Sequence, residues 1–152
     1  MDVRDKLDIL SRDAQYDLSC ACGTKNRDEH RFRGDNNSWV YPVTVASGGS
    51  GIILKTLLSN MCSSDCRYCP LRENVDSRRV SLSPDEIAKF FINFISHRPL
   101  IGIFLSSGII RNADYTMDRL IGVATLLRYR YRYKGYIHIK IIPGASRAAI
   151  DS

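Results

Sequence analysis

The chain has 152 residues, 44% of them hydrophobic and 25% charged, which is the composition of a globular protein long enough to bury one core. Its longest apolar run, residues 51–58, is too short to cross a bilayer. Residues 1–10 alternate charged and aliphatic side chains, unlike a signal peptide, so we expect a cytoplasmic protein with no membrane segment. The net charge of +6 is compatible with DNA or RNA as a partner and does not establish one.

The N-terminal part is predicted to be one helix followed by an irregular extension. Aliphatic residues recur at helical spacing among charged ones, which predicts an amphipathic helix over roughly residues 3–15. Residues 17–38 are polar and show no period, so we expect an extended loop there. We expect residues 1–51 to be an N-terminal extension and residues 52–152 to form the main α/β unit.

The next segments alternate between apolar strands and amphipathic helices. Residues 47–51 have turn composition and precede a buried strand over residues 52–58. A helix is predicted to begin after Ser83, because Pro84 suits the first helical position and Glu86 is placed for a capping box. Its expected buried face is Ile87, Phe90, Phe91, Phe94 and Ile95.

Two more units follow the same pattern. Residues 100–105 form an all-apolar strand, residues 117–127 have helical periodicity, and residues 136–142 form a third strand. Apolar strands separated by helices indicate parallel β-α-β crossovers with both sheet faces covered. The predicted fold class is therefore α/β, the N-terminal portion of a partial (β/α) barrel with parallel strands. A full barrel needs about 250 residues, so we expect the chain to be part of a larger barrel or to be completed by a partner chain.

Three cysteines follow the first buried strand. Cys62, Cys66 and Cys69 lie close together in a polar loop, at the end of a parallel strand where α/β barrels build active sites. Five cysteines in a cytosolic chain are more often metal ligands, catalytic groups or buried thiols than disulfides. Because a four-iron four-sulfur cluster takes one thiolate per iron, three ligands would leave one iron open to a cofactor or substrate.

This spacing, with Tyr68 immediately before the last cysteine, resembles the signature of the radical S-adenosylmethionine superfamily. The resemblance extends over residues 52–152, as three βα units. It implies that Cys62, Cys66 and Cys69 hold a 4Fe-4S cluster. It also implies that the open iron chelates the amino and carboxylate groups of S-adenosylmethionine, with Tyr68 near the adenosine.

The segment after the second strand carries a weaker form of the same resemblance. Ser106, Ser107 and Gly108 occupy the place where family members have a Gly-Gly-Glu-like segment that contacts the methionine amino group. The resemblance implies cofactor binding by these residues, although the carboxylate is missing. Their hydroxyls can donate or accept hydrogen bonds. The alternative is an ordinary strand-to-loop turn, in which Ser and Gly are common.

Several segments together are similar to a bacterial group of radical S-adenosylmethionine proteins assigned to DNA modification or repair. These segments are residues 2–14, 16–20, 62–69, 105–110 and 135–145. The similarity implies a DNA or RNA substrate and a flavodoxin- or ferredoxin-type electron donor. It also implies reductive cleavage of S-adenosylmethionine, which yields methionine and a 5′-deoxyadenosyl radical that takes a hydrogen atom from the substrate.

The competing function is a non-enzymatic zinc or iron–sulfur module that binds nucleic acid. A structural zinc site needs four ligands, so the triad would need a fourth from Cys20, Cys22 or His30. Cys20 and Cys22 could instead ligate a second cluster or serve as accessory thiols, and two thiols alone close no site.

Three further motifs each have a structural interpretation. The glycines at 48–51 precede a strand, whereas a phosphate loop follows one, so no phosphate loop is expected. Residues 128–134 interleave Arg and Lys with Tyr, which suits phosphates and unpaired bases, but such residues are also common at a solvated helix end. His138, on the third strand, is predicted to be a packed core residue.

Overall fold

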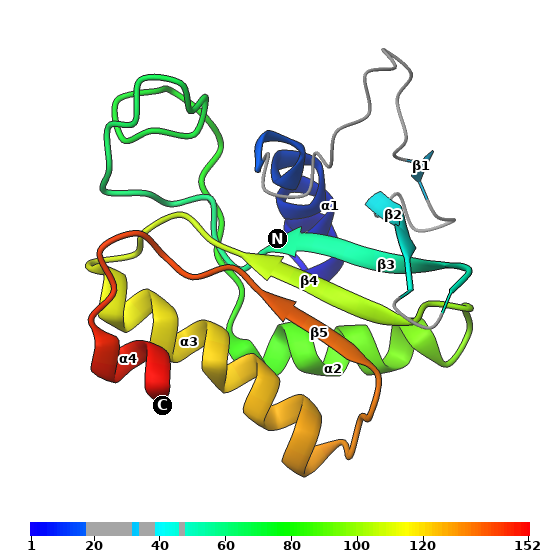
Figure 1. Ribbon diagram of the computed structural model, residues 1–152. Helices are drawn as coiled ribbons and strands as arrows, with labels where there is room; N and C mark the ends of the chain where they lie inside the picture. The colour runs from blue at the N-terminus through cyan, green and yellow to red at the C-terminus, as the bar shows by residue number, and fades with distance from the viewer. Residues whose placement is uncertain (18–31, 34–38, 46–47) are drawn as a thin grey trace.

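The computed structural model describes residues 1–17, 32–33, 39–45 and 48–152 (Figure 1). These residues form one five-stranded sheet in the order β1-β2-β3-β4-β5. The strands are β1 (Phe32–Arg33), β2 (Trp39–Thr44), β3 (Ser50–Leu57), β4 (Gly102–Ser106) and β5 (Tyr136–Ile139). The helices are α1 (Val3–Asp13), α2 (Pro84–Ile95), α3 (Ala113–Thr125) and α4 (Arg147–Asp151).

The predicted α/β class is confirmed, with a sheet that is only partly parallel. β3 pairs with β4 and β4 with β5 in parallel, which places α2 and α3 in the two predicted crossovers. β1 and β2 are antiparallel additions at the other edge. β5 is shorter than the predicted strand 136–142 and lies at an edge of the described sheet.

The N-terminal helix is confirmed, and it ends earlier than predicted. The Asp2 carboxylate caps α1 by accepting from the Asp5 amide at 2.8 Å, and α1 gives way at Ala14 to a 3₁₀ turn. Leu7 and Leu10 are buried in the core. The predicted loop over residues 17–38 was wrong at β1, which pairs with β2. Cys20, Cys22 and His30 lie outside the described residues.

The predicted turn before the first buried strand joins β2 to β3. Gly48 and Gly49 have φ of 89° and 91°, a conformation that side chains rarely adopt, and the Val45 amide donates to the Gly49 carbonyl at 3.1 Å. The glycines therefore connect two antiparallel strands, whereas a phosphate loop joins a strand to a helix.

The helix predicted to begin after Ser83 is confirmed together with its capping box. The Glu86 amide donates to Ser83 Oγ at 3.2 Å, and the Ser83 amide donates to Glu86 Oε2 at 2.7 Å. α2 and α3 pack side by side against the sheet (Figure 1). The predicted apolar face of α2 packs on the core, with Ile87, Phe91 and Phe94 buried and Phe90 and Ile95 partly buried.

The two faces of the sheet differ in chemistry, because paired residues on neighbouring strands point the same way. One face is apolar and belongs to the core that the helices cover. It carries Val40, Leu54, Ile103, Leu105, Ile137 and Ile139. The alternate positions carry aromatic and cationic side chains beside Ile53 and Gly102: Tyr41, Lys55, Phe104, Tyr136, His138 and, just after β5, Lys140.

This second face corrects the prediction for His138. Its ring lies 4.6 Å from the Phe104 ring, and its Nδ1 lies 3.0 Å from the Tyr136 hydroxyl, so the side chain is half-buried outside the apolar core. Lys55 is fully buried there and donates to the Asp17 carbonyl at 2.7 Å. Lys140 pairs with the Asp17 carboxylate at 2.9 Å. No helix in the described ranges is long and apolar enough to cross a membrane.

Candidate functional site

The three cysteines lie on one loop that leaves the sheet at the carboxyl end of β3. We call residues 61–79 the cysteine loop; it projects beyond the ends of β3 and β4 (Figure 1). The chain enters and leaves this loop side by side. The Leu82 amide donates to the Leu58 carbonyl at 3.0 Å, and Ser59 bridges to Ser81. The predicted position of the cysteines, after a parallel strand, is therefore confirmed.

A buried asparagine fixes the base of the loop. Asn60 Nδ2 donates to the Asp13 carboxylate at 2.7 Å and to the Arg78 carbonyl at 2.8 Å, and its Oδ1 accepts from the Val80 amide at 2.7 Å. The same side chain thus ties both ends of the loop to the end of α1. Because it is buried and satisfied on both its amide nitrogen and its oxygen, its removal would leave polar groups without partners.

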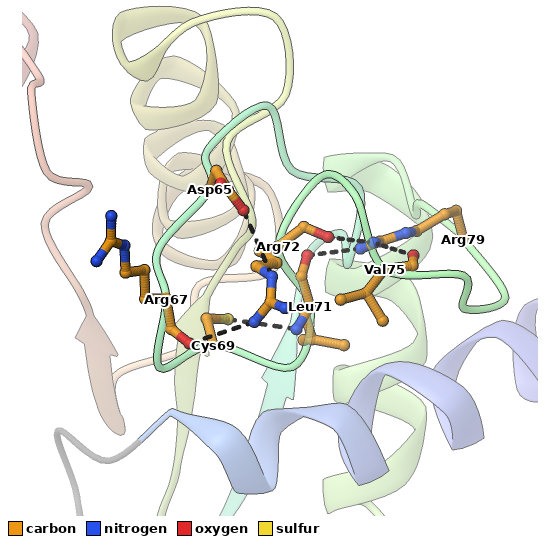
Figure 2. Close-up of polar contacts among 7 residues, drawn as sticks. All are labelled: Asp65, Arg67, Cys69, Leu71, Arg72, Val75 and Arg79. Atoms are coloured by element: carbon orange, nitrogen blue, oxygen red, sulfur yellow. Dashed lines mark hydrogen bonds and ion pairs between the residues drawn. The ribbon is translucent and has the colours of Figure 1, made fainter.

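A single arginine organises the rest of the loop (Figure 2). Arg79 Nη1 donates to the carbonyls of Asn60 and Leu71 at 2.6 and 2.7 Å. Its Nη2 donates to the carbonyls of Arg72 and Val75 at 2.7 and 2.9 Å. A planar guanidinium with several fixed donors is suited to gather carbonyls in this way, and the bonds close residues 71–75 against the loop base.

A second arginine supports the cysteine-bearing half. Arg72 Nη1 donates to the Arg67 carbonyl at 3.2 Å, and its Nε lies 3.4 Å from the Asp65 carboxylate (Figure 2). Both side chains of this ion pair are substantially exposed, so it contributes little stability by itself. Its position does tie residues 65–67 to residue 72.

Two of the three thiols accept hydrogen bonds from backbone amides. The Ile109 amide donates to Cys62 Sγ and the Leu71 amide donates to Cys69 Sγ, both at 3.4 Å (Figure 2 shows the second). Cys66 is exposed, and all three thiols are free. Amide donors to sulfur are found around iron–sulfur ligands, where they tune the cluster potential.

The three thiols lie on one loop but are not close enough together to act as a set of metal ligands. The Cys69 amide donates to the Cys66 carbonyl at 2.9 Å, so these two cysteines flank one turn. Within the described residues, no group of three or more His, Cys, Asp or Glu side chains is close enough to hold a metal ion. The donor set suits a three-thiolate cluster, and the thiols would have to converge to bind one.

The segment after β4 lies against the base of the cysteine loop, as expected for neighbouring parallel strands. The Gly108 amide donates to the Ser59 carbonyl at 2.8 Å, and the buried Ser106 accepts at its carbonyl from the Leu58 amide at 2.8 Å. Ser107 Oγ donates to the Gly108 carbonyl at 2.7 Å. A Cβ atom on Gly108 would collide with the Met61 carbonyl and lie 3.1 Å from Cys62 Cβ.

Tyr68 stands at the outer part of the loop. Its side chain is 85% exposed, and no hydrogen bond or ring contact is found for it within the described residues. The structure therefore brings Gly108 to Cys62, places Ser106 and Ser107 against Leu58 and Ser59, and leaves Tyr68 projecting from the loop. Cofactor binding by all four residues stays a prediction.

The basic and aromatic segment at residues 128–134 lies at the other end of the sheet. Arg128 Nη1 donates to the carbonyls of Tyr133 and Gly135 at 2.7 and 2.8 Å, and Arg130 pairs with Asp85 at 2.8 Å. The Tyr133 hydroxyl donates to the Ile101 carbonyl at 2.9 Å, and burial raises the pKa of this phenol. The segment overlaps a π-helical turn, Leu126–Arg130, which the Tyr131 amide closes by donating to the Leu126 carbonyl at 3.0 Å, and the contacts favour the helix-end interpretation.

Sequence reasoning missed Asn60, Arg79 and a hollow beside Cys62. The hollow has a volume of about 500 Å³, and Arg79, Arg111, Tyr115 and Arg119 are among its lining residues. Asn60 and Arg79 act on backbone carbonyls and amides, for which no spacing rule exists. The one available signal was two adjacent arginines, at 78 and 79, just before a buried segment.

Comparison with protein-family models, curated proteins and solved structures finds no match for this chain.

Proposed function

We propose that this chain belongs to a radical S-adenosylmethionine enzyme with a partial (β/α) barrel, and that Cys62, Cys66 and Cys69 hold its 4Fe-4S cluster. The observation that carries the proposal is the placement of three free thiols on one loop at the carboxyl end of the first strand of a β-α-β-α-β unit. Amide donors to two of those sulfurs support it further.

The residues around the loop have the following proposed roles. Ser106, Ser107 and Gly108 would contact S-adenosylmethionine, because their segment is hydrogen-bonded to Leu58 and Ser59 and reaches Cys62 at Gly108. Tyr68, immediately before Cys69, would lie near the adenosine. The cluster would pass one electron from the electron donor to S-adenosylmethionine, whose sulfonium C–S bond would break to give methionine and a 5′-deoxyadenosyl radical; the protein would orient both groups and exclude water.

The substrate in this proposal is a nucleic acid, DNA or RNA, and the electron donor is a flavodoxin or ferredoxin. The net charge of +6 suits a polyanionic substrate. A cytoplasmic location belongs to the same proposal, since a reducing compartment keeps the three thiols free.

Anaerobic reconstitution with iron and sulfide tests the proposal. Cys62→Ala, Cys66→Ala and Cys69→Ala should each abolish cluster binding, whereas Cys22→Ala, outside the described residues, should leave iron and sulfide content unchanged. The loaded protein should cleave S-adenosylmethionine when reduced. Stoichiometric zinc without cleavage would instead identify a nucleic-acid-binding zinc module, and a full cluster in any triad variant would contradict the ligand assignment.

A further inference from the structure

The hollow beside Cys62 lies between the base of the cysteine loop and α3. Its walls include Cys62 and Ser81 from the two sides of the loop base, Arg111 after β4, and Tyr115 and Arg119 from α3. Its volume of about 500 Å³ falls in the range of small-ligand sites and exceeds what one small ion needs. No acidic side chain is among the described residues that line it.

The lining is strongly cationic. Arg111 and Arg119 both lie over the Tyr115 ring, with guanidinium carbons 4.7 and 5.7 Å from the ring centroid. Arg79 adds a third positive charge, although its four hydrogen bonds commit it to the loop. Three arginines without a carboxylate among them form a site for an anion, and the guanidinium fork matches phosphate geometry.

Arg111 and Arg119 both retain unused hydrogen-bonding capacity. No hydrogen bond or ion pair from the Arg111 side chain is found within the described residues, although its ring contact holds it in place. Arg119 Nη2 donates to the Leu82 carbonyl at 3.1 Å, whereas its Nε is buried without a hydrogen-bond partner there. A buried unsatisfied donor is unfavourable.

The backbone at Arg111 also departs from ordinary conformation. Its φ of 59° lies in the left-handed region, which non-glycine residues seldom occupy and which clusters at ligand sites. The start of α3 does not require this positive φ, because Asn112 caps the helix by accepting from the Tyr115 amide at 2.8 Å. The unusual φ therefore accompanies the placement of a guanidinium over Tyr115.

We propose that this hollow binds a backbone phosphate of a nucleic-acid strand, with Arg111 and Arg119 donating hydrogen bonds to the phosphate oxygens. The inference rests on the proposed function, because it names how the substrate would be held next to the cysteine loop. The polar groups offered beside Tyr115 are guanidinium groups, so the contact would read phosphate and not base identity. The same chemistry would accept free inorganic phosphate, and the experiment separates the two sources.

Binding of a labelled single-stranded DNA oligonucleotide to the full 152-residue chain, followed by fluorescence anisotropy at several salt concentrations, tests the proposal. Arg111→Gln should weaken binding roughly fivefold to tenfold near 0.1 M salt and reduce the slope of log affinity against log salt by about 0.7. Arg111→Lys, which keeps the charge, should fall between. Arg147→Gln is the matched control, because its side chain is 93% exposed on α4 and outside the lining.

Arg119→Lys provides a second variant at the same hollow and should also weaken binding more than the control does. Equal affinity in the Arg111 and Arg147 variants would overturn the proposal, as would no oligonucleotide binding by the unaltered chain. Arg111-dependent binding of inorganic phosphate with Arg111-independent oligonucleotide binding would identify a free-phosphate site and overturn the assignment to nucleic acid.

S-adenosylmethionine affinity, measured on the same variants, completes the test. Loss of cofactor binding in Arg111→Gln with unchanged oligonucleotide affinity would assign the hollow to the cofactor and overturn the proposal. The oligonucleotide assay needs no cluster and is carried out on the apo protein. A chain that binds the oligonucleotide through Arg111 and takes up no cluster would therefore refute the proposed function alone.

Discussion

Gly108→Ala should loosen the cysteine loop, because Gly108 is the point of closest approach between that loop and the segment after β4. An added Cβ would collide with the Met61 carbonyl and lie 3.1 Å from Cys62 Cβ. Neither atom is the free end of a flexible side chain, so the backbone at 61–62 has to move. Overpacking of this kind costs about 1–3 kcal/mol.

Urea denaturation of the apo protein gives this cost as a fall in the free energy of unfolding, and reconstitution gives the accompanying loss of iron. Gly122→Ala is the matched control. Its Cβ would lie 3.6 Å from Pro84, an ordinary contact, within α3, where alanine is favoured over glycine by about 1 kcal/mol. A Gly108→Ala protein as stable as the control, with full iron content, would refute the close approach of the two segments.

The remaining predictions concern the clamp formed by the four hydrogen bonds of Arg79, the cap of α2 and the basic segment at residues 128–134. Arg79→Lys should lower the free energy of unfolding by at least about 2 kcal/mol and expose the loop to protease, since one ammonium cannot serve four carbonyls; unchanged proteolysis would contradict the clamp. The hydrogen bond from the Ser83 amide lowers the pKa of Glu86 in the folded protein. The ionised Glu86 therefore stabilises the fold at pH values above its unfolded-state pKa, and this contribution is lost as the pH falls through its folded-state pKa. Glu86→Gln should flatten the stability profile there, and an unchanged profile would refute the assignment. Arg130→Ala with Arg132→Ala should leave the salt slope of oligonucleotide binding unchanged; a flatter slope would restore the segment as a phosphate contact.

The elements that the sequence predicted well are those whose signals are local. The capping box at Ser83 and Glu86 lies within four residues, and α2 begins where it indicates. The alternation of apolar strands and helices predicted β3, α2, β4 and α3 for the same reason. The position of the cysteines after β3 followed directly from that order, because parallel strands end at one edge of the sheet.

The errors arose where a residue's partner is distant in the chain. β1 was missed because two residues carry no periodicity, and only their pairing with β2 makes them a strand. His138 was placed in the core from the apolar character of its neighbours, but the register with Phe104 puts it on the opposite face. The clamp by Arg79 was invisible for a similar reason, since carbonyls have no sequence signature.

The separation of the two arginine-rich regions bears on how a nucleic acid could reach the proposed site. The segment at residues 128–134 precedes β5 and lies at the amino end of the parallel strands, whereas Arg111 follows β4 at their carboxyl end (Figure 1). The five residues of β4 alone separate these ends by roughly 15 Å. Arg128 and Arg130 are already bound to carbonyls and to Asp85. A strand held at Arg111 would therefore lie next to Cys62 without needing a contact from the basic segment, so the hollow, and not the Arg-Tyr repeat, is the surface on which substrate binding and the cysteine loop can act together.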